Sequence, residues 1–354
     1  MIKWIVRIIG SVSILLLAAL IALGIYKLDC DHAYAPITPD QAAEAKAYLD
    51  ANLTPLPRGI ERGSFSRGDG ASLETMTLAH DAPKGTIVIV PGYTAPLELY
   101  AGTMSAFHEA GYGIAALSTR GQGRSTRATA NPEKGYVEDY QILADDLDAY
   151  IETLDGPIYV FGNSMGGHIA LLMAGENAPD VKAYSLLVPM AEILTGEFPY
   201  WIAEAMTGFY SVVGFGANYG VGRGDWTKPK DYAEPTSCAA NPAKAHLRDA
   251  LVALDPPLRV EGVTNKWVWE TIRSTAAVAS PEHLSKVSAP VLTITAGDDR
   301  VVSTPAAEKN CEGLPNCTLR RFEEARHCIM NETDEVRQAV WAETIAFFDQ
   351  AGAD

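Results

Sequence analysis

The sequence predicts an α/β fold in which a mostly parallel sheet of eight strands is covered by helices on both faces. The first observation is that short β-branched runs alternate with helical patterns from residue 62 onward, which is typical of parallel sheets. The second is a Gly-x-Ser-x-Gly sequence at residues 162–166, between a predicted strand and a predicted helix. The third is the loss of the alternation over residues 191–282, which indicates an inserted cap.

The predicted strands are short runs rich in Val, Ile and other apolar residues. They cover residues 72–80, 86–90, 113–118, 158–161, 183–188, 291–295 and 318–322, with helical patterns at residues 139–154 and 167–175. The cap contains aromatic side chains that either line an acyl-chain pocket or form the core of the cap itself. These are Tyr200, Trp201, Phe209, Tyr210, Trp226, Trp267 and Trp269.

An apolar stretch near the N-terminus has the length of a bilayer-spanning helix. Residues 8–26 carry no ionisable side chain except the Tyr26 phenol. The basic residues Lys3 and Arg7 precede it, so the positive-inside rule predicts a cytoplasmic N-terminus and an extracytoplasmic catalytic domain. A cleaved signal peptide is the alternative, because residues 33–35 resemble a cleavage site. The hypothesis is a single-pass membrane protein.

The predicted domain division follows from these patterns. Residues 1–30 form an N-terminal membrane anchor or uncleaved signal, and residues 31–61 form a polar connector. Residues 62–354 form the catalytic domain, with the cap inserted at about residues 191–282. The sequence gives no indication of the oligomeric state.

Composition argues against a nucleic-acid partner and against a zinc site. The chain has 354 residues, 47% of them hydrophobic, and a formal net charge of −16, which argues against a nucleic-acid partner. Its five cysteines and seven histidines show no zinc-ligand spacing, so no metal is expected. Cys311 and Cys317 are close enough in sequence for a local disulfide, although two unpaired thiols are an equal alternative.

The Gly-x-Ser-x-Gly sequence predicts a nucleophile elbow at Ser164. Gly162 and Gly166 flank the serine because a sharp strand-to-helix turn leaves no room for larger side chains. Such a turn projects the hydroxyl at a helix N-terminus, where the Met165 N–H is predicted to stabilise an oxyanion.

A serine nucleophile needs a base and an acid, and the sequence offers candidates for both. His327 follows the last predicted strand and is the predicted base; His168, inside the helix after the serine, is a weaker alternative. Asp299 follows the strand at residues 291–295 and is the predicted acid, in preference to Asp298. The order serine, aspartate, histidine is the order expected for this arrangement.

The loop after the strand at residues 86–90 is the expected source of a second oxyanion donor, and the Tyr93 N–H is the candidate. Two glycine-rich segments, residues 120–125 and 220–224, lack the spacing of phosphate-binding or dinucleotide-binding loops. The first is interpreted as a structural turn. No cofactor is therefore expected.

Several segments match a known family in sequence. They are Val90-Pro91-Gly92-Tyr93, residues 118–125, residues 162–167, Val188-Pro189-Met190 and residues 325–332. On these segments the chain resembles the monoacylglycerol lipase and lysophospholipase group of α/β hydrolases, whose relatives include some serine aminopeptidases. The resemblance begins at about residue 62 and implies an α/β-hydrolase fold.

The same resemblance assigns roles to residues of this chain. It implies Ser164 as nucleophile, Asp299 as acid and His327 as base, with the Tyr93 and Met165 amides forming the oxyanion hole. Two positions depart from the family. Gln122 stands where a histidine is usual, and Cys328 stands where a glutamate is usual, which places either a reactive or an inert thiol beside the base.

The expected function is hydrolysis of a small-molecule acyl ester, a monoacylglycerol or a lysophospholipid, through an acyl-enzyme on Ser164. One alternative is an aminopeptidase, with Glu192, Glu197 and Glu204 of the cap binding a free amine. The other is a binding protein that keeps the fold without catalysis. The membrane is expected as a partner through the N-terminal helix.

Overall fold

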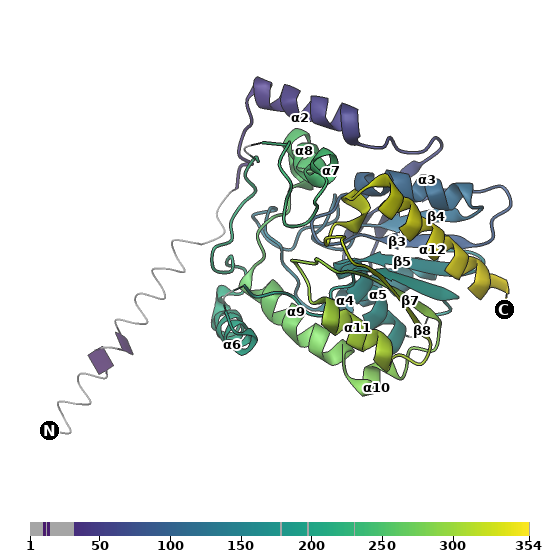
Figure 1. Ribbon diagram of the computed structural model, residues 1–354. Helices are drawn as coiled ribbons and strands as arrows, with labels where there is room; N and C mark the ends of the chain where they lie inside the picture. The colour runs from purple at the N-terminus through teal and green to yellow at the C-terminus, as the bar shows by residue number, and fades with distance from the viewer. Residues whose placement is uncertain are drawn as a thin grey trace.

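The computed structural model of the chain describes residues 10–11, 13–14, 32–177, 179–196, 198–229 and 231–353. Within these ranges an eight-stranded sheet has the order β1-β2-β4-β3-β5-β6-β7-β8 (Figure 1). The pairs β1–β2 and β2–β4 are antiparallel, and all later pairs in this order are parallel. This sheet confirms the predicted architecture. The strands are β1 (Glu61–Ser66), β2 (Ser72–Leu78), β3 (Thr86–Val90), β4 (Gly113–Leu117), β5 (Ile158–Asn163), β6 (Ala183–Leu187), β7 (Val291–Ala296) and β8 (Cys317–Phe322).

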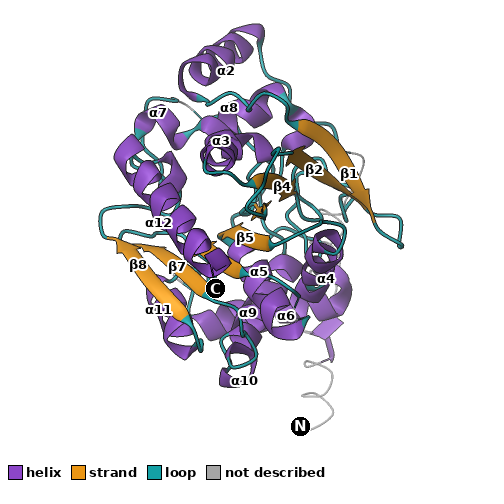
Figure 2. Cartoon of the chain, turned by 90° about the vertical axis from the view of Figure 1, so that its right-hand side faces the viewer, coloured by secondary structure: helices purple, strands orange, loops and turns teal. Residues whose placement is uncertain are grey.

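Helices lie on both faces of the sheet, as Figure 2 shows from a second side. Phe107 of α3 and Phe348 of α12 belong to the core on one face, and Leu147 of α4 and Ile169 of α5 to the core on the other. The helices are α2 (Pro39–Asn52), α3 (Ala101–Glu109), α4 (Tyr140–Ile151), α5 (Met165–Glu176), α6 (Tyr200–Tyr210), α7 (Pro242–Ala245), α8 (Leu247–Leu254), α9 (Asn265–Val278), α10 (Pro281–Leu284), α11 (Thr304–Gly313) and α12 (Asp334–Ala353). Short helical turns are η1 (Leu97–Tyr100), η2 (Ser211–Phe215), η3 (Pro256–Leu258) and η4 (Ile329–Asn331).

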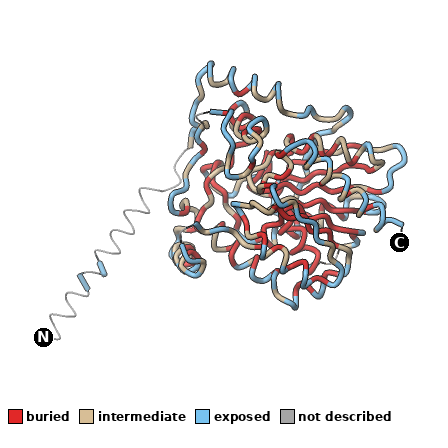
Figure 3. Tube along the Cα trace, viewed as in Figure 1, coloured by how far each residue is buried: buried red, intermediate tan, exposed pale blue. Residues whose placement is uncertain are grey.

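Burial explains which strands the sequence predicts. All residues of β4, β6 and β7 are buried, and Figure 3 shows this buried layer at the centre of the molecule. The central strands are buried on both faces and mostly apolar, which favours their prediction. Seven strands, the largely exposed β8 among them, are predicted within two residues of their observed ends. The sequence does not predict β1 at the sheet edge, because Phe65 is its one large apolar residue and most of its side chains are exposed.

The cap is formed by the chain between β6 and β7. It contains α6 to α10 with long irregular connections, in agreement with the loss of alternation in the sequence. Cap helices α6 and α9 pack together closely, since a Cβ on Gly208 would lie 2.9 Å from the Trp269 indole nitrogen.

The segment before the catalytic domain is folded against the cap. Helix α2 begins with a capping box between Thr38 and Gln41, and Ala45 of α2 packs with Trp226 and Tyr232 of the cap. The division into an N-terminal segment, a connector and a catalytic domain with its cap remains our proposal, with α2 docked on α8.

The predicted membrane span at residues 8–26 falls outside the described residues, apart from residues 10–11 and 13–14. Among the described residues, no helix combines the length and the apolar character needed to cross a bilayer. A span requires about 20 consecutive apolar residues in one helix. This finding contradicts the predicted localisation as a single-pass membrane protein with an extracytoplasmic catalytic domain, and that prediction is corrected accordingly.

Two disulfides are present in the described part of the chain. Cys311 and Cys317 are bonded, which decides between the two alternatives left open by their spacing. Cys238 and Cys328 are also bonded, so the expected free thiol beside His327 is wrong. The spacing of 90 residues gave no local signal for this pair. The second bond ties the cap to the loop that follows β8.

Candidate active site

Ser164 occupies a sharp turn between β5 and α5. Its φ of 51° lies in the left-handed region, which a non-glycine residue adopts only under strain. A Cβ on Gly162 would lie 2.8 Å from the Gly166 carbonyl oxygen, and a Cβ on Gly166 would lie 2.2 Å from the Val90 carbonyl oxygen. Both positions therefore need glycine, and the turn holds the serine at the N-terminus of α5.

The structure brings Ser164, His327 and Asp299 together from three loops at the carboxyl ends of parallel strands. The His327 Nε2 lies 2.9 Å from the Ser164 Oγ, and the His327 Nδ1 lies 2.7 Å from an Asp299 carboxylate oxygen. Because the carboxylate can only accept, Nδ1 carries the proton and Nε2 is free to accept the serine proton.

The second Asp299 oxygen accepts hydrogen bonds from the Val301 and Val302 amides, at 2.8 and 2.9 Å. The Asp299 side chain is 1% exposed, so both oxygens are fixed. Asp298 instead forms an exposed ion pair with Arg300. The neighbouring Arg300 guanidinium holds the pKa of the Asp298 carboxyl below its usual value. Asp298 thus lies outside the hydrogen-bond chain from Ser164 through His327 to Asp299.

Two backbone amides lie beside the serine. Met165 is the first residue of α5, where helical N–H groups have no acceptor inside the helix. Tyr93 follows Gly92, whose ideal Cβ position is 3.2 Å from the Ser164 Cβ, so the two loops touch. Within the described ranges, neither the Tyr93 nor the Met165 N–H has a hydrogen-bond acceptor. Both N–H groups are therefore available to a ligand.

Comparison with known proteins identifies the family. A family model described as serine aminopeptidase S33 (Hydrolase_4) matches residues 81–334. The chain belongs to this S33 family. Lysophospholipase L2 of Escherichia coli strain K12 is 25% identical over 317 residues, which cover 86% of this chain and 92% of that protein. Phospholipase YtpA of Bacillus subtilis is 26% identical over 278 residues, which cover 76% of this chain and 97% of that protein.

Solved structures agree with this assignment at the level of the fold. A soluble variant of monoglyceride lipase from Saccharomyces cerevisiae has a TM-score of 0.63 and 20% identity, covering 82% of this chain and 96% of that one. A carboxyl esterase from Bacillus coagulans has a TM-score of 0.65 and 18% identity, and the match covers 84% of this chain and 100% of that one. The predicted α/β-hydrolase fold, the predicted family group and the prediction of a hydrolase are confirmed.

Gln122, which stands where the monoacylglycerol lipase and lysophospholipase group usually has a histidine, supports the loop of Tyr93 and Thr94. Its side chain is buried, and its Oε1 accepts a hydrogen bond of 2.7 Å from the Thr94 amide. Thr94 has a φ of 64°, a strained conformation that needs support from its surroundings. The Tyr93 hydroxyl donates to the Glu261 carbonyl, and Arg248 donates to the Thr94 hydroxyl. The loop is therefore held from the sheet side and from the cap.

Replacing Gln122 by alanine is expected to lower kcat about tenfold and to leave KM nearly unchanged. Direct removal of an oxyanion donor costs about 10²–10³ in kcat, and loss of a residue that only positions the donor should cost less. Steady-state kinetics on one ester measure both constants. Gln122→His, which restores the usual family residue, is the control and should retain most of the activity. A raised KM with unchanged kcat would contradict the positioning role.

A pocket of about 730 Å³ opens beside the loop of Tyr93 and Thr94, and its volume is within the range of small-molecule sites. Tyr93 and Thr94 form part of its wall, and the cap forms the rest. Its apolar lining includes Ile193, Leu194, Phe198, Ala203, Met206, Val221, Val263, Trp267, Val268 and Val301.

The cap aromatics divide between the two predicted roles. Of the aromatics named in the sequence analysis, Trp267 lines the pocket, while Trp226 is buried in the small core with α2. Trp201 and Phe209 are 69% and 51% exposed and do neither. Aromatic content alone therefore predicts the pocket poorly.

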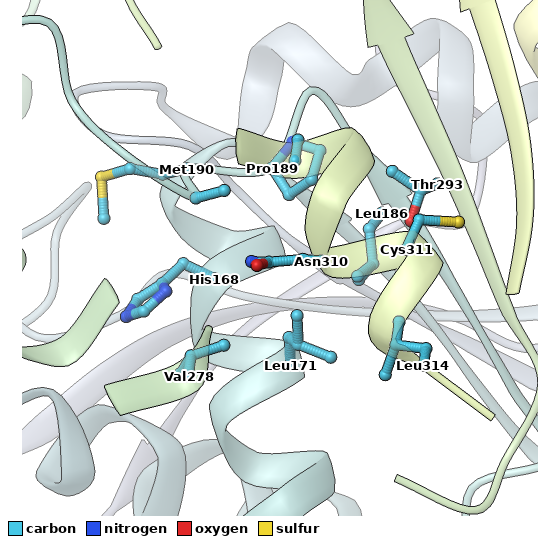
Figure 4. A pocket seen from close by; sticks show the side chains of 12 residues that line it. His168, Leu171, Leu186, Pro189, Met190, Val278, Thr293, Asn310, Cys311 and Leu314 are labelled. Carbon is cyan, nitrogen blue, oxygen red and sulfur yellow. The ribbon is translucent and has the colours of Figure 1, made fainter. Parts of the chain in front are cut away.

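His168 is not part of the hydrogen-bond chain. Its Nε2 lies 2.7 Å from the Ser274 hydroxyl, so the ring is hydrogen-bonded to cap helix α9. Figure 4 shows it among Leu171, Met190 and Val278, at a cavity of about 10 Å³ that is too small for a substrate. Burial, helped by the His283 charge, lowers the pKa of His168 from 6.5 to about 3.

The low pKa of His168 predicts sensitivity to acid. The unfolded chain binds this proton below pH 6.5 and the folded protein does not, so stability falls as pH drops from 6.5 toward 3. Between pH 7.5 and pH 5 the loss should be about 2 kcal/mol. Urea unfolding at both pH values measures it. His168→Gln should lose about 2 kcal/mol less over the same interval, and an identical loss in both proteins would contradict the burial argument.

The segment at residues 120–125 is a structural turn, as expected. Arg120 pairs with Asp146, and Arg124 pairs with Glu74 and Glu98.

Sequence reasoning missed Tyr100, whose hydroxyl accepts hydrogen bonds from the Gly92 amide and from the Asn163 side chain. It gave no signal because a tyrosine in a short helical turn has no motif of its own.

Proposed function

We propose that the chain is a serine ester hydrolase that forms an acyl-enzyme on Ser164, with a single-chain lipid ester as substrate. The substrate class is a lysophospholipid or a monoacylglycerol. The observation that carries the proposal is the continuous hydrogen-bond chain from Asp299 through His327 to Ser164. Beside it lie the Tyr93 and Met165 amides, which have no acceptor in the part of the chain that the structure describes.

The reaction follows from the protonation states. The Ser164 Oγ attacks the ester carbonyl carbon as its proton passes to the His327 Nε2, and the carbonyl oxygen becomes an oxyanion. The Tyr93 and Met165 amides donate hydrogen bonds to that oxyanion. The intermediate then expels the alcohol, which takes the proton from His327. Water attacks the acyl-enzyme in the same way and releases the carboxylic acid.

Ester and lipid specificity is supported by the relatives and by the pocket. The names of the relatives include lysophospholipase, phospholipase and monoglyceride lipase. The pocket beside the oxyanion loop is mostly apolar and wide enough for an acyl chain. No cofactor has a step in this mechanism.

The family description also raises the aminopeptidase alternative, which needs a free carboxylate to bind the substrate amine. Glu192 and Glu204 do not line the pocket, and the side chain of Glu197 is not described. Of the carboxylates that do line it, Glu261 pairs with Arg248, and Asp225 accepts from Asn131 and Tyr219. Esters are therefore the better-supported substrates.

A substrate panel tests this proposal. Lysophospholipids, monoacylglycerols and aminoacyl arylamides are incubated with the full chain and with Ser164→Ala, and release of acid or arylamine is measured. Release of fatty acid that disappears in the variant is the expected result. Faster cleavage of arylamides favours the peptidase, and no turnover of any substrate by folded protein favours a binding protein.

A further inference from the structure

The glycine-rich segment of the cap, residues 220–224, forms a tight turn in the wall of the pocket. The Arg223 amide donates to the Gly220 carbonyl at 3.0 Å, and Gly222 has a φ of 74°. A positive φ at the third residue is the mark of a type II turn, which favours glycine there. The segment is not a dinucleotide loop, but its side chains and backbone line the pocket.

This turn has a fixed position relative to the oxyanion loop. The Gly220 amide donates to the Val263 carbonyl, and the Gly262 amide donates to the Gly224 carbonyl, at 2.9 and 3.1 Å. Next to these residues, the Tyr93 hydroxyl donates a hydrogen bond of 2.8 Å to the Glu261 carbonyl. One strip of backbone thus connects the turn to the loop that supplies an oxyanion donor.

The electrostatic field of Arg223 reaches this donor loop. Burial is the main cause that raises the pKa of the Tyr93 phenol, and the Arg223 charge acts in the opposite direction. Arg223 and Tyr93 also line the same pocket, so the cation lies in the cavity that opens beside the Tyr93 loop.

Arg223 differs from the other arginines that line the pocket. Arg248 pairs with Glu261, and Arg300 pairs with Asp298. Arg223 is exposed, and within the described ranges its guanidinium has no ion pair and no hydrogen bond. Of the three described arginines that line the pocket, it is the one whose donors are available to a ligand.

The glycines next to Arg223 leave room for such a ligand. A Cβ built on Gly222 or on Gly224 would meet no atom within 4 Å, so open space lies beside both residues. A polar head group can approach the backbone here without a clash.

We propose that Arg223 binds the phosphate of a lysophospholipid whose ester lies at Ser164, so that phosphate-bearing substrates are preferred over monoacylglycerols. The inference rests on the proposed function and specifies its substrate. A guanidinium donates two parallel hydrogen bonds to a phosphate, which a neutral glycerol head group cannot match. A free cation at this point also offsets the net charge of −16 that otherwise repels an anionic lipid.

A matched pair of substrates tests the assignment. 1-Decanoylglycerol and its 3-phosphate differ only in the phosphate, and both are used below the concentration at which they aggregate. The wild-type chain should have a higher kcat/KM on the phosphate. Arg223→Gln should lose about tenfold on the phosphate and less than twofold on the neutral ester. Arg223→Lys should lose less than Arg223→Gln, because it keeps the charge but not the paired donors.

The control is Arg273→Gln, an exposed arginine of cap helix α9 that does not line the pocket. It should leave kcat/KM on both esters unchanged. Lysophosphatidylcholine with the same acyl chain shows whether a zwitterionic head group keeps the preference. Equal losses on the phosphate and the neutral ester, or no loss on either, overturns the role of Arg223.

A binding measurement separates this inference from the proposed function. If neither ester is cleaved, the hydrolase proposal fails, but calorimetry on the Ser164→Ala protein still reports binding. Tighter binding of the phosphate than of the neutral ester, lost in Ser164→Ala/Arg223→Gln, supports the phosphate site. Equal binding of the two lipids overturns it.

Discussion

Replacing Ser164 by alanine is expected to lower kcat by about 10⁴-fold or more while leaving the fold and KM nearly unchanged. The hydroxyl is the only group of the triad that would bond to the acyl carbon, so its removal stops acyl-enzyme formation. The Tyr93 and Met165 amides still bind the carbonyl oxygen, which accounts for a small residual rate. Steady-state kinetics on a lysophospholipid, with thermal unfolding as a check of the fold, measure the effect.

Adjacent aspartates supply a matched control for this prediction. Asp299→Asn should lower kcat by about 10³–10⁴, because an amide next to the His327 Nδ1 no longer holds the productive tautomer. Asp298→Asn removes an equal charge one residue away, from an exposed pair with Arg300, and should change kcat less than threefold. Comparable losses in the two variants would mean that the triad acid has been misassigned.

Removal of the disulfide between Cys238 and Cys328 is expected to have the largest effect on stability. The bond joins residues 90 apart, and the chain-entropy model gives about 4–5 kcal/mol for a loop of that length. It also fixes the residue next to His327, since the Cys328 amide donates to the Cys238 carbonyl at 2.7 Å. The Cys238→Ser/Cys328→Ser variant should therefore be less stable and slower in kcat, as urea unfolding and kinetics can measure.

The second disulfide is the control for this comparison. Cys311 of α11 and Cys317, the first residue of β8, are only 6 residues apart. Their double serine variant should lose about 2 kcal/mol by the same model and keep its kcat. If both double variants lose equal stability and equal activity, the Cys238–Cys328 disulfide does not specifically stabilise the region around His327.

The fold could be predicted largely because its strands are buried on both faces. β4 and β6 are fully buried runs of mostly apolar residues, and the glycines around Ser164 mark the elbow. β1 could not be predicted, since its exposed side chains give no apolar pattern. The packing of α2 on the cap could not be predicted from the sequence either. It depends on tertiary contacts, such as those of Ala45, that leave no pattern along the chain.

The candidate site was predictable where a residue follows a strand of the parallel sheet. Ser164, Asp299 and His327 each have that position, and their order in the chain matches the fold. The supports of the site were not predictable. Gln122 and Tyr100 act through hydrogen bonds to backbone amides, and such contacts leave no spacing pattern in a sequence. The predicted membrane localisation is wrong, since among the described residues no helix is long and apolar enough to cross a bilayer.

Labelling with a fluorophosphonate tests the central claim most directly, since this reagent bonds to a serine oxygen only when a base activates it. The full chain is treated with the reagent and digested, and mass spectrometry locates the adduct. One adduct is expected, on Ser164, and it should form much more slowly in His327→Ala. Folded protein that stays unlabelled, or an adduct on a different residue, would contradict the account.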